Sequence, residues 1–228
     1  MTTEVSIVLL RHAQGSLGSD DYDRLSPLGF TQAERLGARV RRQWGAVRPI
    51  RGSLRRHRET ATALSDAARI DPDLDEYRVD GLLQSLRPRA GELGVDWPGE
   101  HALADPVAYL EQFLRWFPHV LDAWQQARLD CEVNGPWSAF AARVAAAGAR
   151  LEAEAAESGL AVAVTSAGVI STLVAGLTGR DLAWQRALNV ELYNASVTEL
   201  VGRPGHGWNV RRLNCVEHLG EPGLVSHA

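Results

Sequence analysis

Residues 5–16, Val-Ser-Ile-Val-Leu-Leu-Arg-His-Ala-Gln-Gly-Ser, pass from a nearly continuous apolar run into a polar loop. The run has the length of one strand, and its composition is typical of a strand buried on both faces of a parallel sheet. It is too short for a signal peptide or a membrane span, and Arg11 closes it. Because open α/β sheets bind ligands at the carboxyl ends of their strands, Arg11 and His12 are the first candidate site residues. The alternative is that this pair belongs to a plain solvated loop.

Strands and helices alternate along most of the chain. Ser26 and Pro27 open a helix, because serine caps a helix N-terminus and proline is tolerated at the first helical position. Ser138 is predicted to cap another helix, which Gly159 ends. The other predicted elements are strands at 50–54, 160–165, 195–201 and 208–213 and helices at about 56–68 and 168–177. This alternation predicts an α/β fold, a three-layer α/β/α sandwich with a mostly parallel sheet.

Residues of about 85–135 break the alternation. Their first part is rich in proline and glycine, which is typical of irregular structure. A long helical stretch follows at about 106–129, and Pro118 should kink or split it. We expect one domain over residues 1–228, with this region as a helical insertion over the site. Its aromatic side chains at 109–124 form either a substrate lid or the core of the inserted helices.

The chain has 228 residues and a formal net charge of −4, and all 24 of its basic residues are arginine. A GC-rich coding sequence explains the absence of lysine, which excludes Schiff-base lysines, P-loop lysines and Ser-Lys dyads. The composition, 45% hydrophobic and 23% charged, is that of a globular protein, and the mild acidity gives no sign of nucleic-acid or membrane partners. Cys131 and Cys215 have neither metal-ligand nor disulfide-framework spacing. We expect a cytoplasmic protein.

A second basic cluster follows the second predicted strand, at the start of a helix, and contains Arg55, Arg56, His57 and Arg58. Cations at a helix N-terminus oppose the helix dipole. The cluster therefore indicates either an anion held jointly with the helix N-terminus or a solvated, mildly self-repelling face. His57 and Arg58 are expected either to line the mouth of the site or to be surface residues.

Five motifs carry a resemblance to a known family. Leu10-Arg11-His12 is similar to an Arg-His-Gly signature, and residues 53–61, Ser-Leu-Arg-Arg-His-Arg-Glu-Thr-Ala, to a Leu-x-Arg signature followed by Thr-Ala. The later motifs are Leu74-Asp75-Glu76, residues 162–170 and Asn194-Ala-Ser-Val-Thr198. In this order they resemble the histidine phosphatase (phosphoglycerate mutase-like) superfamily, from residue 5 to about residue 200.

The resemblance implies a metal-free phosphomonoester hydrolase that needs no cofactor and acts on a small phosphate ester. In that mechanism His12 attacks the phosphoryl group and becomes phosphohistidine, while Arg11 and Arg56 clamp the non-bridging oxygens. Glu76 protonates the departing alkoxide and then deprotonates water. Phosphoryl transfer needs mainly positioning and charge stabilisation, so arginines around a histidine suit it without a metal.

The chain departs from the family pattern where a second histidine is expected. The strand-end His-Gly is here Ser166-Ala167, which resembles a branch with Thr-Ser-Gly-Gly. Ser166 donates one hydrogen bond but carries no charge, and losing one preorganised donor costs on the order of 3 kcal/mol. Ala13 replaces glycine, which strains the backbone only if that position needs positive φ. Possible substrate contacts, or plain loop and surface residues, are Gln14, Ser16 and Arg58.

Three other interpretations stay open. One is a catalytically weak member that binds a phosphorylated or carboxylated ligand. A mutase is disfavoured, because it must retain its phosphate without the second histidine. A serine hydrolase would use Ser166 after a strand, with His218 as its base. The substrate and the oligomeric state are left open, with a homodimer among the expected states.

Overall fold

The computed structural model describes residues 4–16, 23–95, 106–203 and 205–227, and the backbone alone for 106–111. One six-stranded sheet runs through it in the order β3-β2-β4-β1-β5-β6. Neighbours among β3, β2, β4 and β1 are parallel, whereas β5 is antiparallel to both β1 and β6. The strands are β1 (Val5–Arg11), β2 (Ile50–Arg51), β3 (Arg69–Ile70), β4 (Leu160–Thr165), β5 (Val197–Arg203) and β6 (Gly207–Cys215).

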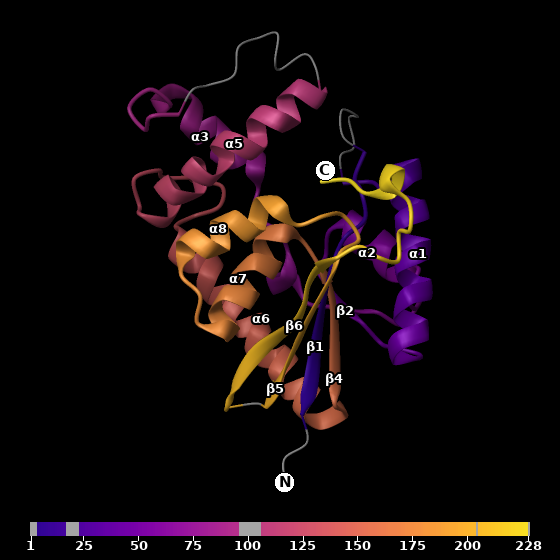
Figure 1. Ribbon diagram of the computed structural model, residues 1–228. Helices are drawn as coiled ribbons and strands as arrows, with labels where there is room; N and C mark the ends of the chain where they lie inside the picture. Colours follow the sequence, from indigo (N-terminus) through magenta and orange to yellow (C-terminus); the bar gives the residue numbers. More distant parts are fainter. Residues whose placement is uncertain (1–3, 17–22, 96–105, 204, 228) are drawn as a thin grey trace.

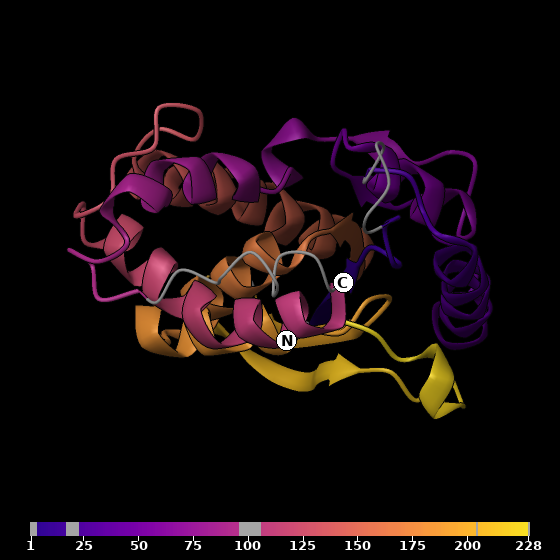
Figure 2. The same cartoon turned by 90° about the horizontal axis from the view of Figure 1, so that it is seen from above.

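Helices cover both faces of the sheet (Figures 1 and 2). The α-helices are α1 (Pro27–Trp44), α2 (Arg55–Thr62), α3 (Val79–Leu86), α5 (Pro106–Gln125), α6 (Trp137–Ser158), α7 (Ala167–Thr178) and α8 (Leu182–Glu191). Short 3₁₀ turns occupy Pro72–Leu74, Arg87–Arg89 and Pro222–Leu224. The predicted α/β sandwich with a mostly parallel sheet is confirmed. None of the described helices is long and apolar enough to cross a membrane.

Strand β1 explains the three layers. Successive side chains of a strand point to opposite faces. Ile7 and Leu9 belong to a core with the buried side chains of α6 and α7, whereas Val8 and Leu10 belong to a second core with those of α1. All four side chains are fully buried. A strand that supplies two cores must be apolar on both faces, which is why residues 5–10 form a nearly continuous apolar run.

The helix termini show which local signals decide the boundaries. Ser26 caps α1 by accepting a hydrogen bond from the Gly29 N–H, as predicted. The prediction that Ser138 caps α6 is wrong, because the helix already begins at Trp137 after an extended Pro136, which places Ser138 inside the first turn. Pro118 does not split α5.

Helix α5, which belongs to the region expected as an insertion, lies beyond the ends of β1 and β4 (Figure 1). Residues 96–105 fall outside the described part of the chain. Phe117 and Trp124 of α5 are buried against Tyr77, within the same core as β1 and α6. This packing favours the core interpretation of these aromatic side chains over a lid.

At Gly29 the backbone of α1 lies directly against the backbone of Gln14, in the loop after β1. A Cβ there would lie 2.1 Å from the Gln14 carbonyl oxygen, whereas Gly176, exposed within α7, has open space around it. We predict that Gly29→Ala lowers the free energy of unfolding by about 1–3 kcal/mol. Gly176→Ala should raise it by about 0.5–1 kcal/mol, because alanine favours the helix. Urea denaturation followed by circular dichroism measures both, and a change of the same sign in the two variants would contradict the prediction.

Candidate active site

His12 lies where β1 ends, and its side chain is 3% exposed. Its backbone N–H donates to the Thr165 carbonyl of β4 at 2.8 Å, which extends the parallel pairing by one residue. Its Nδ1 lies 2.8 Å from the Ala13 carbonyl oxygen, so Nδ1 must carry the proton that donates there. Its Nε2 accepts a hydrogen bond from the Arg56 Nε at 3.2 Å. The imidazole therefore presents an unprotonated Nε2 beside a guanidinium.

The surroundings keep His12 uncharged. Burial, followed by the charges of Arg56 and Arg11 and the neighbouring His57, lowers the pKa of His12 well below its usual range. A neutral imidazole with an unprotonated Nε2 is the form that acts as a nucleophile, once the Arg56 hydrogen bond to that nitrogen gives way to the substrate. Arg11 is also buried, and its guanidinium donates to the Leu192 carbonyl oxygen. The structure thus brings three of the predicted residues, Arg11, His12 and Arg56, together.

The N-terminus of α2 already holds an anion, the carboxylate of Asp23. Its oxygens accept from the Arg55 backbone N–H at 2.7 Å and from the Arg56 guanidinium at 2.8 Å. The basic cluster at this helix start is therefore balanced by a carboxylate of the chain itself. Asp23 fixes the direction in which Arg56 points, and the binding of a ligand's anion by these arginines stays a prediction.

Glu76 lies beside the start of α7. Its carboxylate accepts from the Gly168 N–H at 2.8 Å. Removal from water raises the pKa of Glu76, against the lowering effects of that hydrogen bond and of the charges on Arg56 and Arg11. Gly168 is needed for this contact, because a Cβ there would lie 2.3 Å from a Glu76 carboxylate oxygen. A carboxyl group with a raised pKa, close to two arginines, is suited to exchange protons with a substrate.

Ser166 follows β4 directly and is 1% exposed. Its hydroxyl lies 2.7 Å from the Nε2 of His57, which is fully buried. The alternative that His57 is a surface residue is therefore excluded. The suggestion that His218 could serve as a base for Ser166 is also wrong, because the histidine beside Ser166 is His57.

The remaining predicted contacts divide into two kinds. The Gln14 side-chain oxygen accepts from the Ser26 hydroxyl, and its backbone N–H donates to Gln32, so Gln14 joins the loop after β1 to α1. Arg58 is exposed and Ser16 partly buried, and contact of either with substrate stays a prediction. Ala13 has no positive φ, so alanine causes no strain there.

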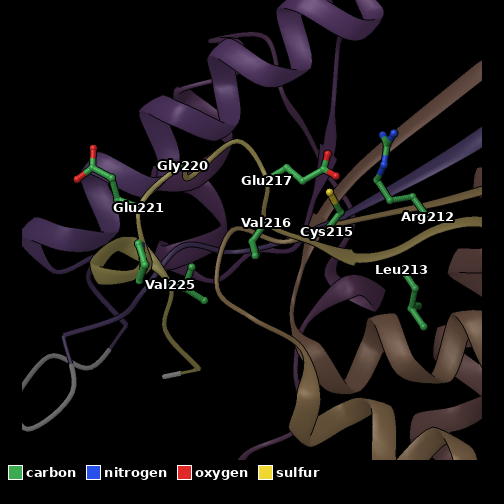
Figure 3. Close-up of a pocket in the computed structure, with 9 residues that line it drawn as sticks. Arg212, Leu213, Cys215, Val216, Glu217, Gly220, Glu221 and Val225 are labelled. Carbon is green, nitrogen blue, oxygen red and sulfur yellow. The ribbon is translucent and has the colours of Figure 1, made fainter.

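A shallow groove opens elsewhere on the surface, beside β6 and the C-terminal segment (Figure 3). Its lining includes Arg212, Cys215, Glu217 and Val225, and it shares no residue with the group around His12. The residues gathered around His12 are therefore not part of this groove. The described residues contain no group of three or more histidine, cysteine or acidic side chains that could hold a metal ion.

Comparison with known proteins assigns the family. The model of the histidine phosphatase superfamily (branch 1) matches residues 7–216. The chain belongs to the histidine phosphatase superfamily. This match spans β1 to β6 and includes all the residues gathered around His12. No curated protein sequence matches the chain closely enough to count as a relative.

Solved structures share the histidine phosphatase fold. A mycobacterial glucosyl-3-phosphoglycerate phosphatase in complex with inorganic phosphate is 25% identical, with a TM-score of 0.62, over 94% of this chain and 99% of that one. A phosphoglycerate mutase from Bacillus anthracis is 19% identical, with a TM-score of 0.62, over 95% of this chain and 96% of that one. The second similarity concerns the fold alone.

Sequence reasoning missed Asp23 and the buried position of His57 in this histidine phosphatase. Asp23 lies far from α2 in sequence, and no local pattern links the two. His57 did carry a signal, because Thr60 and Ala61, three and four residues later, are buried on the same face of α2. That spacing places His57 inside the protein rather than at the mouth of the site.

The buried histidines predict a loss of stability in acid. Burial lowers the pKa of His57 to about 4, so the unfolded chain binds more protons than the folded one between pH 6.5 and 4. The free energy of unfolding therefore falls as the pH falls, by up to about 3 kcal/mol from this histidine. His57→Gln should reduce the loss measured by urea denaturation at pH 7 and pH 4.5. The variant His206→Gln, at an exposed turn, serves as the control, and equal losses in wild type and His57→Gln would contradict the prediction.

Proposed function

We propose that this histidine phosphatase is a metal-free phosphomonoester hydrolase that acts through a phosphohistidine on His12. The observation that carries the proposal is the neutral imidazole, whose Nδ1 donates to the Ala13 carbonyl and whose Nε2 faces Arg56. In the first step Nε2 forms a bond to phosphorus while the bond from phosphorus to the ester oxygen breaks. Water then attacks the phosphohistidine, inorganic phosphate leaves, and the lone pair returns to Nε2.

Glu76 balances the protons of the two steps. Its raised pKa favours the protonated carboxyl that gives a proton to the departing alkoxide, and the resulting carboxylate takes a proton from the attacking water. Arg11 and Arg56 hold the non-bridging oxygens, and they oppose protonation of His12 before the attack. We assign a hydrogen-bonding role toward the phosphoryl group to Ser166.

The substrate class we propose is a small phosphate ester. The similarity to a phosphatase captured with inorganic phosphate supports it. A site of two arginines and a neutral histidine also attracts a dianionic group more strongly than an uncharged one. We further propose that residues of about 85–135 form an insertion within a single domain rather than a second domain.

A second candidate function is anion binding with little turnover. It is favoured by Ser166, which carries no charge at the phosphoryl site, and by Asp23, whose carboxylate already pairs with Arg56 at 2.8 Å. It predicts binding of phosphate or a carboxylate without a covalent intermediate.

The two candidates differ in what His12→Ala does. Under the proposed function this variant lowers kcat/KM for p-nitrophenyl phosphate by at least about 10³-fold, because it removes the nucleophile. An alkaline quench of the wild type should trap a phosphorylated His12, detected by mass spectrometry. Treatment with EDTA should leave the rate unchanged, and His206→Gln is the matched control. A rate that persists in His12→Ala would reject the phosphohistidine route.

The role of Glu76 depends on the leaving group. Glu76→Gln cannot give up a proton, so kcat/KM, which reports the departure of the alcohol and not the later attack of water, should fall by about 10²–10⁴-fold with an alkyl ester such as glycerol 2-phosphate. The fall should be smaller with p-nitrophenyl phosphate, whose phenolate leaves without a proton when departure limits the rate. Steady-state kinetics with both esters measures the difference. The same loss with both esters would show that Glu76 is not the proton donor.

A further inference from the structure

The histidine that meets Ser166 comes from α2, next to Arg56. The His57 ring centroid lies 5.6 Å from that of His12, and its Nε2 lies 2.7 Å from the Ser166 hydroxyl oxygen. Both side chains of this contact are buried, at 0% and 1% exposure. A full imidazole is thus packed against the serine that ends β4, within reach of the proposed phosphoryl site.

The opposite edge of the His57 ring faces a carboxylate. Its Nδ1 has no hydrogen-bond partner among the described residues, and Asp75 Oδ1 lies 3.7 Å away. Asp75 is itself fixed by the Ser53 hydroxyl and backbone N–H. Gly52 makes the approach possible, because a Cβ there would lie 2.2 Å from the Nδ1. This carboxylate favours a second proton on the ring.

The serine has one hydroxyl proton, and the state of His57 decides where it points. If Ser166 donates to Nε2, the serine has no proton left for a ligand. If Nε2 is protonated and donates to the Ser166 oxygen, the hydroxyl proton is free to reach a phosphoryl oxygen. An imidazolium satisfies both edges, with Nε2–H toward Ser166 and Nδ1–H toward Asp75.

The charged groups around His57 oppose one another. The guanidinium of Arg56 in α2 disfavours a charge on the ring, whereas Asp75 and Asp23 favour it. The neighbouring His12, after β1, is itself uncharged. In the free protein burial is the largest influence and keeps His57 neutral. A dianion bound between Arg11 and Arg56 compensates the guanidinium charge and adds its own attraction, which shifts this balance toward the imidazolium.

We propose that His57 is a positioning residue that takes up a proton when a phosphoryl dianion binds, and that it acts through Ser166 to supply a hydrogen-bond donor and a positive charge. The inference rests on the proposed function, since it assumes that the dianion binds beside His12. Under this proposal the protonated His57 of α2 supplies the positive charge that Ser166 does not carry.

Anion binding tests the proton uptake without requiring turnover. Sulfate is the probe, because it remains a dianion at neutral pH. Isothermal titration calorimetry of sulfate at pH 7, in buffers of different ionisation enthalpy, should show close to one proton taken up by the wild type and clearly less by His57→Gln. The His206→Gln control should match the wild type. No uptake in the wild type, or unchanged uptake in His57→Gln, would overturn the proposal.

Kinetics tests whether His57 and Ser166 act as one unit. His57→Gln and Ser166→Ala should each lower kcat for p-nitrophenyl phosphate by about 10²-fold, the loss typical of one preorganised donor, with a smaller change in KM. The double variant should lose no more than either single variant, because the second substitution removes nothing that still functions. If the kcat losses of the two single variants multiply in the double variant, His57 and Ser166 do not act as one unit, and the proposal is overturned. Circular dichroism and thermal unfolding establish that each variant is folded.

Two results separate this inference from the proposed function. Equal rates in the wild type and His12→Ala would reject the phosphohistidine route, and the sulfate experiment would still decide the role of His57. A fluorophosphonate adduct on Ser166 that disappears in His57→Gln would identify the serine as a nucleophile with His57 as its base. That outcome would overturn the donor role proposed for the pair.

Discussion

The parallel pairing of β1 with β4 is the constraint on which the site depends. Arg11 lies opposite Thr165, and the His12 N–H donates to the Thr165 carbonyl, so the residues after both strands emerge side by side. A shift of one residue would exchange the side chains of β1 between the two cores and move His12 away from its place opposite the end of β4. The strand pairing and the packing of residues 5–10 into both cores therefore fix His12 relative to Ser166.

The site places two arginine charges in poorly solvated surroundings, and the two guanidiniums have different kinds of partner. Arg56 has Asp23, and Arg11 donates to a backbone carbonyl. Neither histidine is charged in the free protein, because burial and the arginines lower both pKa values. Because the histidines are neutral, folding does not incur the desolvation cost of two further buried charges. The positive charge of the guanidiniums remains able to attract an anion. Arginine suits this arrangement, and the lack of lysine removes nothing that the proposed chemistry requires.

The fold was predictable where one interaction dominates locally. The apolar run of β1, the Ser26 cap and Gly159 at the end of α6 each act over a few residues, and each is confirmed. The short β3, with two exposed residues, and the helices α3 and α8 were not predicted. The predicted split of the helical stretch at Pro118 is wrong, because α5 continues through it. Tertiary packing, with Phe117 and Val120 buried on either side of Pro118, outweighs one missing backbone hydrogen bond.

The candidate site was predictable to the extent that its residues follow strand ends. The contact between His57 and Ser166 was not, because it joins α2 to β4 across 109 residues. The geometry of this contact nevertheless explains why a small residue stands at position 166. With the His57 Nε2 only 2.7 Å from the Ser166 oxygen, a larger side chain at position 166 would occupy the space of the imidazole. The histidine at position 57 therefore requires a small residue at position 166, and the imidazole of α2 fills space that a larger side chain there would occupy.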